Sequence, residues 1–403
     1  MKKASTDMQH YRNNAWACVR CGICKMTNPE KIRGQKHADN CPSGTRFKFE
    51  PYYGSGKHEL VRALTSFRPE ISIDETLLHI IYTCTQCGAC GEICEPVKGI
   101  NPYHASAALR EYVVEEGFGP LPEHKTLIKS IMNYGNPWLS PRAGRTRWTK
   151  KLGFKPKNVQ KEKVSVLFYP GCTQALDPVV QEVAVATARL LQKADVDYGM
   201  LWDKEYCCGS TVLRVGDRAT FNTIKEYNMQ MFKDLDIDLM VTSCSGCNSI
   251  LKEEYAEELP FPVMHTIEYI DRLIQEGRMK PSKKIASRKA TYHDPCHLGR
   301  YTDIYDAPRR VIEAIPGMDF VEMDRIREYS WCCAAGGGVR TAFRNDLALW
   351  SADLRLEEAR ETGADMLLTT CPFCEQNFKE AVAQKDYGIE IMDVLEVLDS
   401  TLE

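Results

Sequence analysis

Four apolar runs rich in β-branched and aromatic residues alternate with helical patterns in the C-terminal part of the chain. Each run predicts a strand that ends at a cysteine, and the runs occupy 163–172, 236–244, 289–296 and 363–371. A helical pattern of apolar positions follows the second and the fourth run, at 248–259 and 375–384. Strands that alternate with helices form parallel sheets, and such sheets bind ligands at the carboxyl ends of their strands. We therefore expect an α/β arrangement whose cysteines gather at one side.

Helical periodicity dominates the N-terminal part. Residues 72–84 begin with Ser72 and Glu75 at capping-box spacing and continue with apolar positions of one helix face, so they predict a helix. Residues 101–117 predict another helix, which Gly117 ends. We expect a mainly helical domain here, and the α+β fold class for the chain as a whole.

Length and composition allow several domains and exclude some functions. With 403 residues, 43% of them hydrophobic, the chain is long enough for two or three domains with buried cores. A net charge of −3 argues against a nucleic-acid-binding protein. The N-terminus lacks the apolar stretch of a secretory signal, and the longest apolar runs, such as 77–82, fall far short of the roughly 20 residues that cross a bilayer. We expect a cytoplasmic protein, which a partner could attach to the inner face of the membrane.

Cysteine is the residue type that stands out, with 18 copies. A disulfide scaffold, zinc sites and iron–sulfur clusters can each use so many. Because the chain lacks a secretory signal and groups many of its cysteines in C-x2-C spacings, thiolate metal ligands are favoured over disulfides. Some cysteines form longer groups than a zinc site uses, and these groups favour iron–sulfur clusters over zinc.

Two cysteine runs in the N-terminal part have the spacing of a two-cluster ferredoxin. One run is C-x2-C-x2-C-x3-C followed closely by Pro96. The other has three cysteines at the same spacing, and Cys41-Pro42 supplies its fourth after an insertion of 16 residues. In such proteins the fourth cysteine of each run binds the cluster of the other run. We therefore predict two [4Fe-4S] cubanes, the first bound by Cys18, Cys21, Cys24 and Cys94 and the second by Cys84, Cys87, Cys90 and Cys41.

The remaining ten cysteines form two sets of five, about 125 residues apart. Each set consists of a lone cysteine, an adjacent pair and a C-x2-C. The first set is Cys172, Cys207, Cys208, Cys244 and Cys247, and the second is Cys296, Cys332, Cys333, Cys371 and Cys374. We interpret the two sets as one duplicated unit, and together with the two ferredoxin runs they use every cysteine of the chain.

This double pattern, with "YPGC", "DPCHLGR" and "CCAAGGG", resembles the cysteine-rich CCG domain of heterodisulfide reductases. Fused behind a two-cubane ferredoxin domain, it resembles the family of D-type subunits of those enzymes. The resemblance implies that each set of five cysteines holds a non-cubane [4Fe-4S] cluster, up to two in all, and that the adjacent pair helps to bridge irons. Two features depart from the family. The insertion before Cys41 is closer to the D-type subunit of class II benzoyl-CoA reductase complexes, and Ala334 replaces a glycine that the first copy keeps as Gly209.

The resemblance also implies a function. The chain would be an iron–sulfur oxidoreductase subunit of an anaerobic complex, which relays electrons through the cubanes to the non-cubane clusters and could reduce a disulfide there. His293 and His297 flank Cys296, so they are candidate catalytic proton donors to the leaving thiolates, although either could instead bond to cluster sulfur.

Other functions share these motifs. The chain could relay electrons without disulfide chemistry in a class II benzoyl-CoA reductase-type complex, or in a flavin-dependent hydroxyacid or glycerol-3-phosphate dehydrogenase. A zinc-scaffolded assembly protein is a third alternative. The sequence has no dinucleotide fingerprint, so we expect no flavin or NAD on this chain and predict partner subunits that carry flavin or clusters.

Four segments follow from these assignments. We predict a ferredoxin-like domain at 1–119, a basic linker at 120–163, and the first and second CCG domains at 164–285 and 286–403. The linker has eleven lysines and arginines against two acidic residues. It could bind an acidic partner or a membrane surface through Trp138 and Trp148, or wrap around the protein itself. Two further groups of residues have less specific patterns: Gly336, Gly337 and Gly338 predict a close backbone approach, and Arg300, Arg309, Arg310 and Arg340 could hold an anionic substrate or face solvent.

Overall fold

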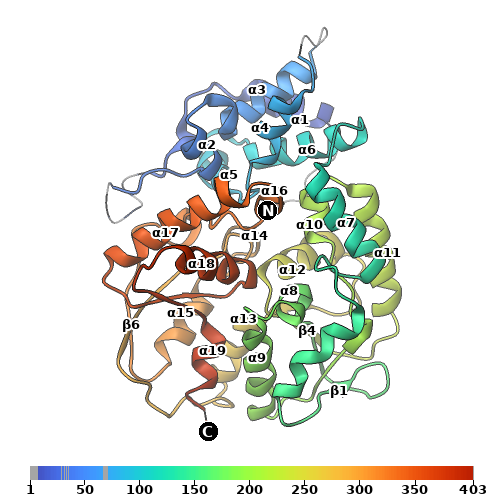
Figure 1. Cartoon of the computed structure of the whole chain (residues 1–403), viewed down its shortest axis with the longest axis vertical. Helices are drawn as coiled ribbons and strands as arrows, with labels where there is room; N and C mark the ends of the chain where they lie inside the picture. Colours follow the sequence, from blue (N-terminus) through green and yellow to red (C-terminus); the bar gives the residue numbers. More distant parts are fainter. Residues whose placement is uncertain are drawn as a thin grey trace.

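Figure 1 shows a helical N-terminal part that lies across two α/β halves, which stand side by side. This computed structural model describes residues 8–402 apart from 29, 31, 33, 35 and 67–70. The predicted α+β fold class is confirmed. No helix in the described part of the chain has the length and apolar character needed to span a membrane.

The N-terminal part is helical, as predicted. Its α-helices are α1 (Met8–Ala17), α2 (Pro42–Phe47), α3 (Gly54–Leu64), α4 (Glu75–Tyr82), α5 (Ala89–Lys98) and α6 (Pro102–Glu115). Helix α3 packs against α1 and α6. The helix expected at 72–84 is α4, but its N-cap is Asp74 and not Ser72, because the Asp74 carboxylate accepts a hydrogen bond from the Leu77 N–H at 2.8 Å. Gly117, with φ +80°, follows the end of α6 as expected.

Residues 120–163 pack on the first α/β half. They form α7 (Pro122–Tyr134), the 3-10 helix η4 (Arg142–Lys151) and the short strand β1 (Lys157–Asn158), which pairs with the first sheet. Trp148 is fully buried, and Trp138 is partly buried against the core. The segment therefore wraps around the protein itself, and Trp148 is not available as a surface anchor.

The first half contains an all-parallel sheet in the order β1-β3-β2-β4-β5. The strands are β2 (Val166–Phe168), β3 (Tyr198–Met200), β4 (Leu239–Thr242) and β5 (Val263–His265). The helices are α8 (Gly171–Leu176), α9 (Gln181–Lys193), α10 (Ser210–Arg214), α11 (Arg218–Phe232), α12 (Ser245–Ile250), which continues as the π-helix η6 (Leu251–Tyr255), and α13 (Thr266–Gln275).

The second half repeats this arrangement with the parallel order β7-β6-β8-β9. The strands are β6 (Arg288–Tyr292), β7 (Met318–Phe320), β8 (Met366–Thr369) and β9 (Glu390–Asp393). The helices are α14 (Gly299–Thr302), α15 (Asp306–Glu313), α16 (Val339–Ala342), the π-helix η8 (Arg344–Ala348), α17 (Leu349–Glu361), α18 (Pro372–Gln384) and α19 (Val394–Asp399).

The two halves pack reciprocally. Helix α13 of the first half packs against α15 of the second, and α19 of the second packs against α9 of the first, as Figure 1 shows. Because α9 corresponds to α15 and α13 to α19 in the two sheet orders, this is the contact pattern of a pseudo-twofold pair. One hydrophobic core contains side chains of both sheets, including Phe168 and Tyr292.

Candidate metal centres

The first group of predicted cubane ligands lines one small cavity. Its volume is about 10 Å³, and Cys18, Cys21, Cys24 and Cys94 all line it. Cys21 is exposed, whereas Cys24 and Cys94 are buried, so one edge of this site faces solvent. Burial raises the pKa of Cys24 and of Cys94. Protonated thiols packed together in this way suit a site whose ligands lose their protons when metal binds.

The second group lines a separate cavity of about 30 Å³. Its predicted sulfur ligands, Cys41, Cys84, Cys87 and Cys90, all line it. Burial, followed by the neighbouring Cys84, raises the pKa of Cys41 and of Cys90. The structure therefore brings each predicted set of four together, including the crossed fourth cysteine of each run.

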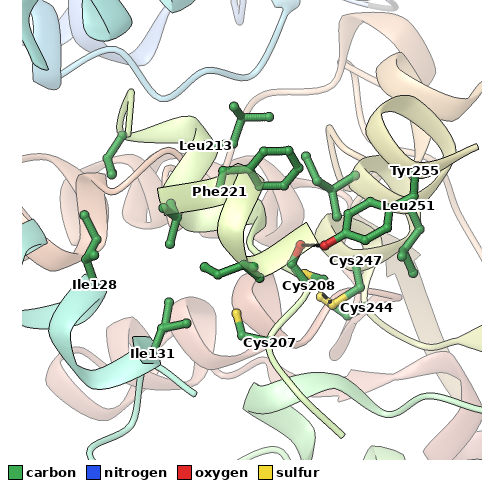
Figure 2. Packing of buried hydrophobic residues seen from close by; sticks show 14 of the residues in the cluster. Ile128, Ile131, Cys207, Cys208, Leu213, Phe221, Cys244, Cys247, Leu251 and Tyr255 are labelled. Carbon is green, nitrogen blue, oxygen red and sulfur yellow. Dashed lines mark hydrogen bonds between the residues drawn. The ribbon is translucent and has the colours of Figure 1, made fainter. Parts of the chain in front are cut away.

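The first set of five cysteines lies at the carboxyl ends of β2 and β4 and on the loop before α10. Figure 2 shows Cys207, Cys208, Cys244 and Cys247 close together, with the Tyr255 hydroxyl bonded to the Cys208 carbonyl at 3.0 Å. The sulfur atoms of Cys208 and Cys247 are 3.3 Å apart. Gly171 precedes the lone cysteine with φ +78°, and a Cβ there would lie 3.2 Å from the Cys247 sulfur, so the turn leaves little room for a side chain.

The second set of five repeats this geometry. The sulfur atoms of Cys333 and Cys374 are 3.2 Å apart. The Ala334 N–H donates to the Cys332 sulfur at 3.3 Å, as the Gly209 N–H does to the Cys207 sulfur at 3.4 Å. Each adjacent pair thus turns its two sulfurs in different directions, one toward a backbone donor and one toward the C-x2-C.

One cavity of about 420 Å³ separates the two sets of five. Its sulfur-bearing lining comes from both halves: Cys172, Cys207, Cys208, Cys244, Cys247, Cys296, Cys333, Cys371 and Cys374. Leu127, Trp138 and Phe373 add apolar surface, and Arg214, Arg340 and Arg344 add positive charge. The strand-end prediction is thus correct in that the cysteines gather at one side, and both copies share a single chamber.

A buried ion pair supports the first set. Arg145 of η4 donates to the Cys172 sulfur at 3.1 Å and to the Glu205 carboxylate at 2.5 Å. Glu205 also accepts from the Gly171 N–H at 3.1 Å. Burial raises the pKa of Glu205 to about 7, against the opposing effect of Arg145. A cation from the predicted linker therefore neutralises charge at this sulfur site.

The second cubane group adjoins the second set of five. Cys332 donates to Cys87 and lowers the pKa of the Cys87 thiol. Arg300 links the same two regions, because it donates to the Cys87 carbonyl at 2.8 Å and to the Ser330 carbonyl at 2.8 Å. Arg300 is therefore a structural link, and neither a solvent-facing residue nor a substrate residue.

The triple-glycine loop contacts the ferredoxin-like part. Arg110 of α6 donates to the Gly337 carbonyl at 2.5 Å and to the Cys84 carbonyl at 2.5 Å. A Cβ at Gly337 would lie 2.6 Å from the Thr85 carbonyl oxygen, so only glycine permits this approach. The expected close backbone approach is present, and the segment that it meets carries predicted cubane ligands.

The two candidate catalytic histidines have different surroundings. His297 lines the large cavity, with Nδ1 3.3 Å from the Cys296 sulfur and its ring stacked on Tyr301. Its Nε2 has no partner among the described residues. His293 instead lies beside the sulfurs of Cys333 and Cys374 and is not among the lining residues of that cavity. Burial lowers the pKa of both imidazoles.

The other three arginines named in the sequence analysis also differ in their surroundings. Arg309 is buried in ion pairs with Asp294 and Glu322, and Arg310 pairs with Asp271 at its partly exposed position. Arg340 alone of the four lines the large cavity, where it also pairs with Glu380. Sequence reasoning did not find the roles of Arg145 or Arg110, because nothing in their spacing links them to distant cysteines.

Comparisons with known proteins agree with this organisation. The family model described as a cysteine-rich domain matches residues 166–252 and 290–379, and the one described as a 4Fe-4S dicluster domain matches 14–98. The D subunit of the dihydromethanophenazine:CoB–CoM heterodisulfide reductase of Methanosarcina mazei is 33% identical over 394 residues, covering 96% of this chain and 93% of that protein. An EtfAB:quinone oxidoreductase of Syntrophomonas wolfei is 30% identical over 96% of this chain and 58% of its own length. The B subunit of the fumarate reductase (CoM/CoB) of Methanothermobacter marburgensis is 30% identical over 79% of this chain and 61% of its own length.

Proposed function

Because this chain belongs to the family of heterodisulfide reductase D subunits, we propose that it carries two cubanes and two five-cysteine clusters and reduces a disulfide between the latter two. The predicted family resemblance and the iron–sulfur class of cofactor are confirmed. So is the broader function, an iron–sulfur oxidoreductase subunit of an electron-transfer complex. The substrate, the ligand sets and the individual partners belong to the proposal.

The ligand sets are the four groups of cysteines described above. Each cubane group lines a cavity of its own, and the contact of Cys87 with Cys332 joins the second group to the second set of five. When bound, the clusters would supply one-electron transfers. The chain would hold them in order, from the partly exposed first group to the large chamber.

The observation that carries the proposal is the chamber lined by both sets of five. Reduction of a disulfide breaks one S–S bond, takes up two electrons and two protons, and releases two thiols. A chamber with a cluster site on each side would let each sulfur of the substrate disulfide bind at a different cluster. Apolar walls such as Phe373 would keep water away from the two thiolates as they separate. His297 stays our predicted proton donor, since it lines this chamber beside the Cys296 sulfur. Unchanged turnover and an unchanged pH profile in His297→Gln would contradict that role.

The test uses anaerobically purified full-length protein. We expect about 16 iron atoms and 16 acid-labile sulfides per chain, four for each cluster, and thiol release from a disulfide when a low-potential donor is supplied. Zinc in place of iron would favour a scaffold protein and contradict the proposal. Iron at the expected level without thiol release would leave the second candidate, an electron relay of the kind that the Syntrophomonas relative suggests.

Partner subunits follow from the relatives. The heterodisulfide reductase and fumarate reductase proteins are subunits, so this chain works with other redox subunits. We propose that these carry the flavin or further clusters, and that the complex resides in the cytoplasm or at the inner face of the membrane. Purification of the native complex under anaerobic conditions identifies those neighbours.

A further inference from the structure

Helix α3 lies between the two cubane cavities and contributes to both. Gly54 and Lys57 line the cavity of the second group, whereas Ser55 and His58 line the cavity of the first group. Residues three apart share one face of a helix. Gly54 and Lys57 therefore face one cavity, and Ser55 and His58 face the other. Lys57 and His58, neighbours in sequence, therefore line separate cysteine cavities.

Lys57 is a buried cation at the second cubane group. Its side chain is 2% exposed, and Nζ donates to the carbonyls of Pro51 at 2.8 Å and Ile80 at 2.7 Å. In the described part of the chain no carboxylate forms an ion pair with it. Burial lowers the pKa of Lys57 to about 8, against the opposing effect of the neighbouring Cys84 and Cys41 sulfurs, which line the same cavity. A buried ammonium needs negative charge nearby, and the second predicted cluster site is where this cavity would supply it.

His58 is an unpaired buried imidazole at the first cubane group. The residue is 1% exposed, and neither Nδ1 nor Nε2 has a hydrogen-bond partner within the described ranges. Burial lowers the pKa of His58 to about 4, so the ring is neutral and carries one N–H. A buried N–H without an acceptor is costly, and the sulfurs of the cavity that it lines are the acceptors at hand. The orphaned nitrogen thus fits a bond to thiolate or to cluster sulfide.

We propose that Lys57 and His58 set the reduction potentials of the two cubanes independently, Lys57 by its charge and His58 by an N–H···S hydrogen bond. Reduction makes a cluster more negative, so a nearby cation or a hydrogen-bond donor favours the reduced state and raises the potential. At the second site, the charge of the buried Lys57 offsets the burial that would otherwise disfavour reduction. This inference rests on the ligand sets of the proposed function. Both residues are positioning residues, because they act through the clusters and not on the substrate.

The experiment is an EPR-monitored redox titration of the anaerobic full-length chain, with iron content measured for every sample. Lys57→Gln removes the charge and keeps a donor for the carbonyls, and we expect it to move one cubane midpoint to a more negative potential. His58→Phe removes the donor, and we expect it to move the other midpoint in the same direction. The matched controls, Lys57→Arg and His58→Gln, keep the charge or the N–H and should leave both midpoints near their original values.

The shifts of the two midpoint potentials test whether Lys57 and His58 act on different cubanes. If both variants move the same midpoint, or neither moves any while iron is retained, the inference is overturned and the proposed function stands. A variant that loses iron shows a structural role for that residue and also overturns its tuning role. If the unaltered protein shows no cubane signals, the proposed function itself fails.

Discussion

At the scale of single residues, the two adjacent cysteine pairs differ in the residue that follows them. Gly209 and Ala334 both have positive φ, +81° and +61°, and both donate their N–H to the first sulfur of the pair. Glycine adopts this conformation without strain, whereas alanine does not. The alanine methyl packs with Val339 and Leu347, and Ala334 is not among the residues that line the large cavity. The departure from the family pattern therefore affects stability and does not crowd the chamber.

This difference predicts opposite effects of two reciprocal changes. Ala334→Gly should stabilise the protein by about 1 kcal/mol, because it relieves the left-handed strain. Gly209→Ala should destabilise it by more than about 1 kcal/mol, since the new Cβ would also lie 2.8 Å from the Phe221 ring. Anaerobic thermal unfolding measures both. A less stable Ala334→Gly variant would show that the methyl contacts outweigh the strain.

Residue spacing grouped the cysteines but did not find the groups that act on them. The repeated intervals between cysteines were sufficient to predict four sets, and the members of each predicted set of four line one cavity. The cations Lys57, Arg110 and Arg145 are far from these cysteines in sequence, and only the fold brings them close. No local sequence pattern indicates such contacts. These cations could be found only once the helices that carry them were placed beside the cysteines.

At the scale of elements, the glycine loop before α16 determines how closely the ferredoxin-like part approaches the second half. We expect Gly337→Ala to push the segment of Thr85 away and to slow electron transfer from the second cubane by about tenfold or more, since an error of 1 Å in position is costly. Gly388→Ala is the matched control, because Gly388 has a similar φ of +65° but nothing within 4 Å of its added Cβ. Stopped-flow reduction measures the rates. Equal rates in the two variants would contradict a role for this contact.

Helix α17 provides a pH-dependent ion cluster. Glu358 is buried and pairs with Arg325 and Arg355, and although burial opposes it, these two arginines lower the pKa of Glu358 to about 2 from an ordinary 4.5. A depressed pKa means that the stabilisation is complete above about pH 4.5 and is lost as the pH falls toward 2.

The corresponding test compares the unaltered chain with Glu358→Gln. Above pH 4.5 we expect the unaltered protein to be more stable, and its advantage to fall by about 1.4 kcal/mol per pH unit below that value. Denaturant unfolding at several pH values measures the difference in unfolding free energy between the two proteins. Loss of clusters in acid affects both proteins alike and so cancels in this difference. An advantage that does not change with pH would exclude the ion cluster as its source.

Strand prediction succeeded where an apolar run ends at a cysteine. The predicted strands β2, β4, β6 and β8 are present, and each lies in such a run. The neighbouring strands β3, β5, β7 and β9 were not predicted, because with three or four residues each they are too short to show a period and no cysteine marks their ends. The basic segment 120–163 was equally ambiguous, since its charges hid the apolar face that packs on the first half.

At the scale of the whole molecule, the route into the chamber is asymmetric. The second set of five adjoins the second cubane group through Cys332 and Cys87. No corresponding contact for the first set occurs among the described residues, and that set faces the second one across the cavity. Electrons from the cubanes should therefore reach the second set before the first.

Two equivalent cysteines test this order. Cys374→Ser should damage the second centre and block reduction of the first by a donor that acts on the cubanes. Cys247→Ser should damage the first centre and leave the second reducible at its normal rate. Freeze-quench EPR after mixing with the donor distinguishes the two. Normal reduction of the first centre in Cys374→Ser would demonstrate a direct route from the cubanes.

The reciprocal contacts of α9, α13, α15 and α19 have a consequence for how this protein can be divided. Each half covers an apolar helix face of the other. If the chain were divided near residue 285 and the fragments were made separately, each fragment would expose this apolar face and tend to aggregate. Co-produced fragments should instead reassemble without a peptide link. We therefore expect the two copies of the duplicated unit to be stable only as a pair.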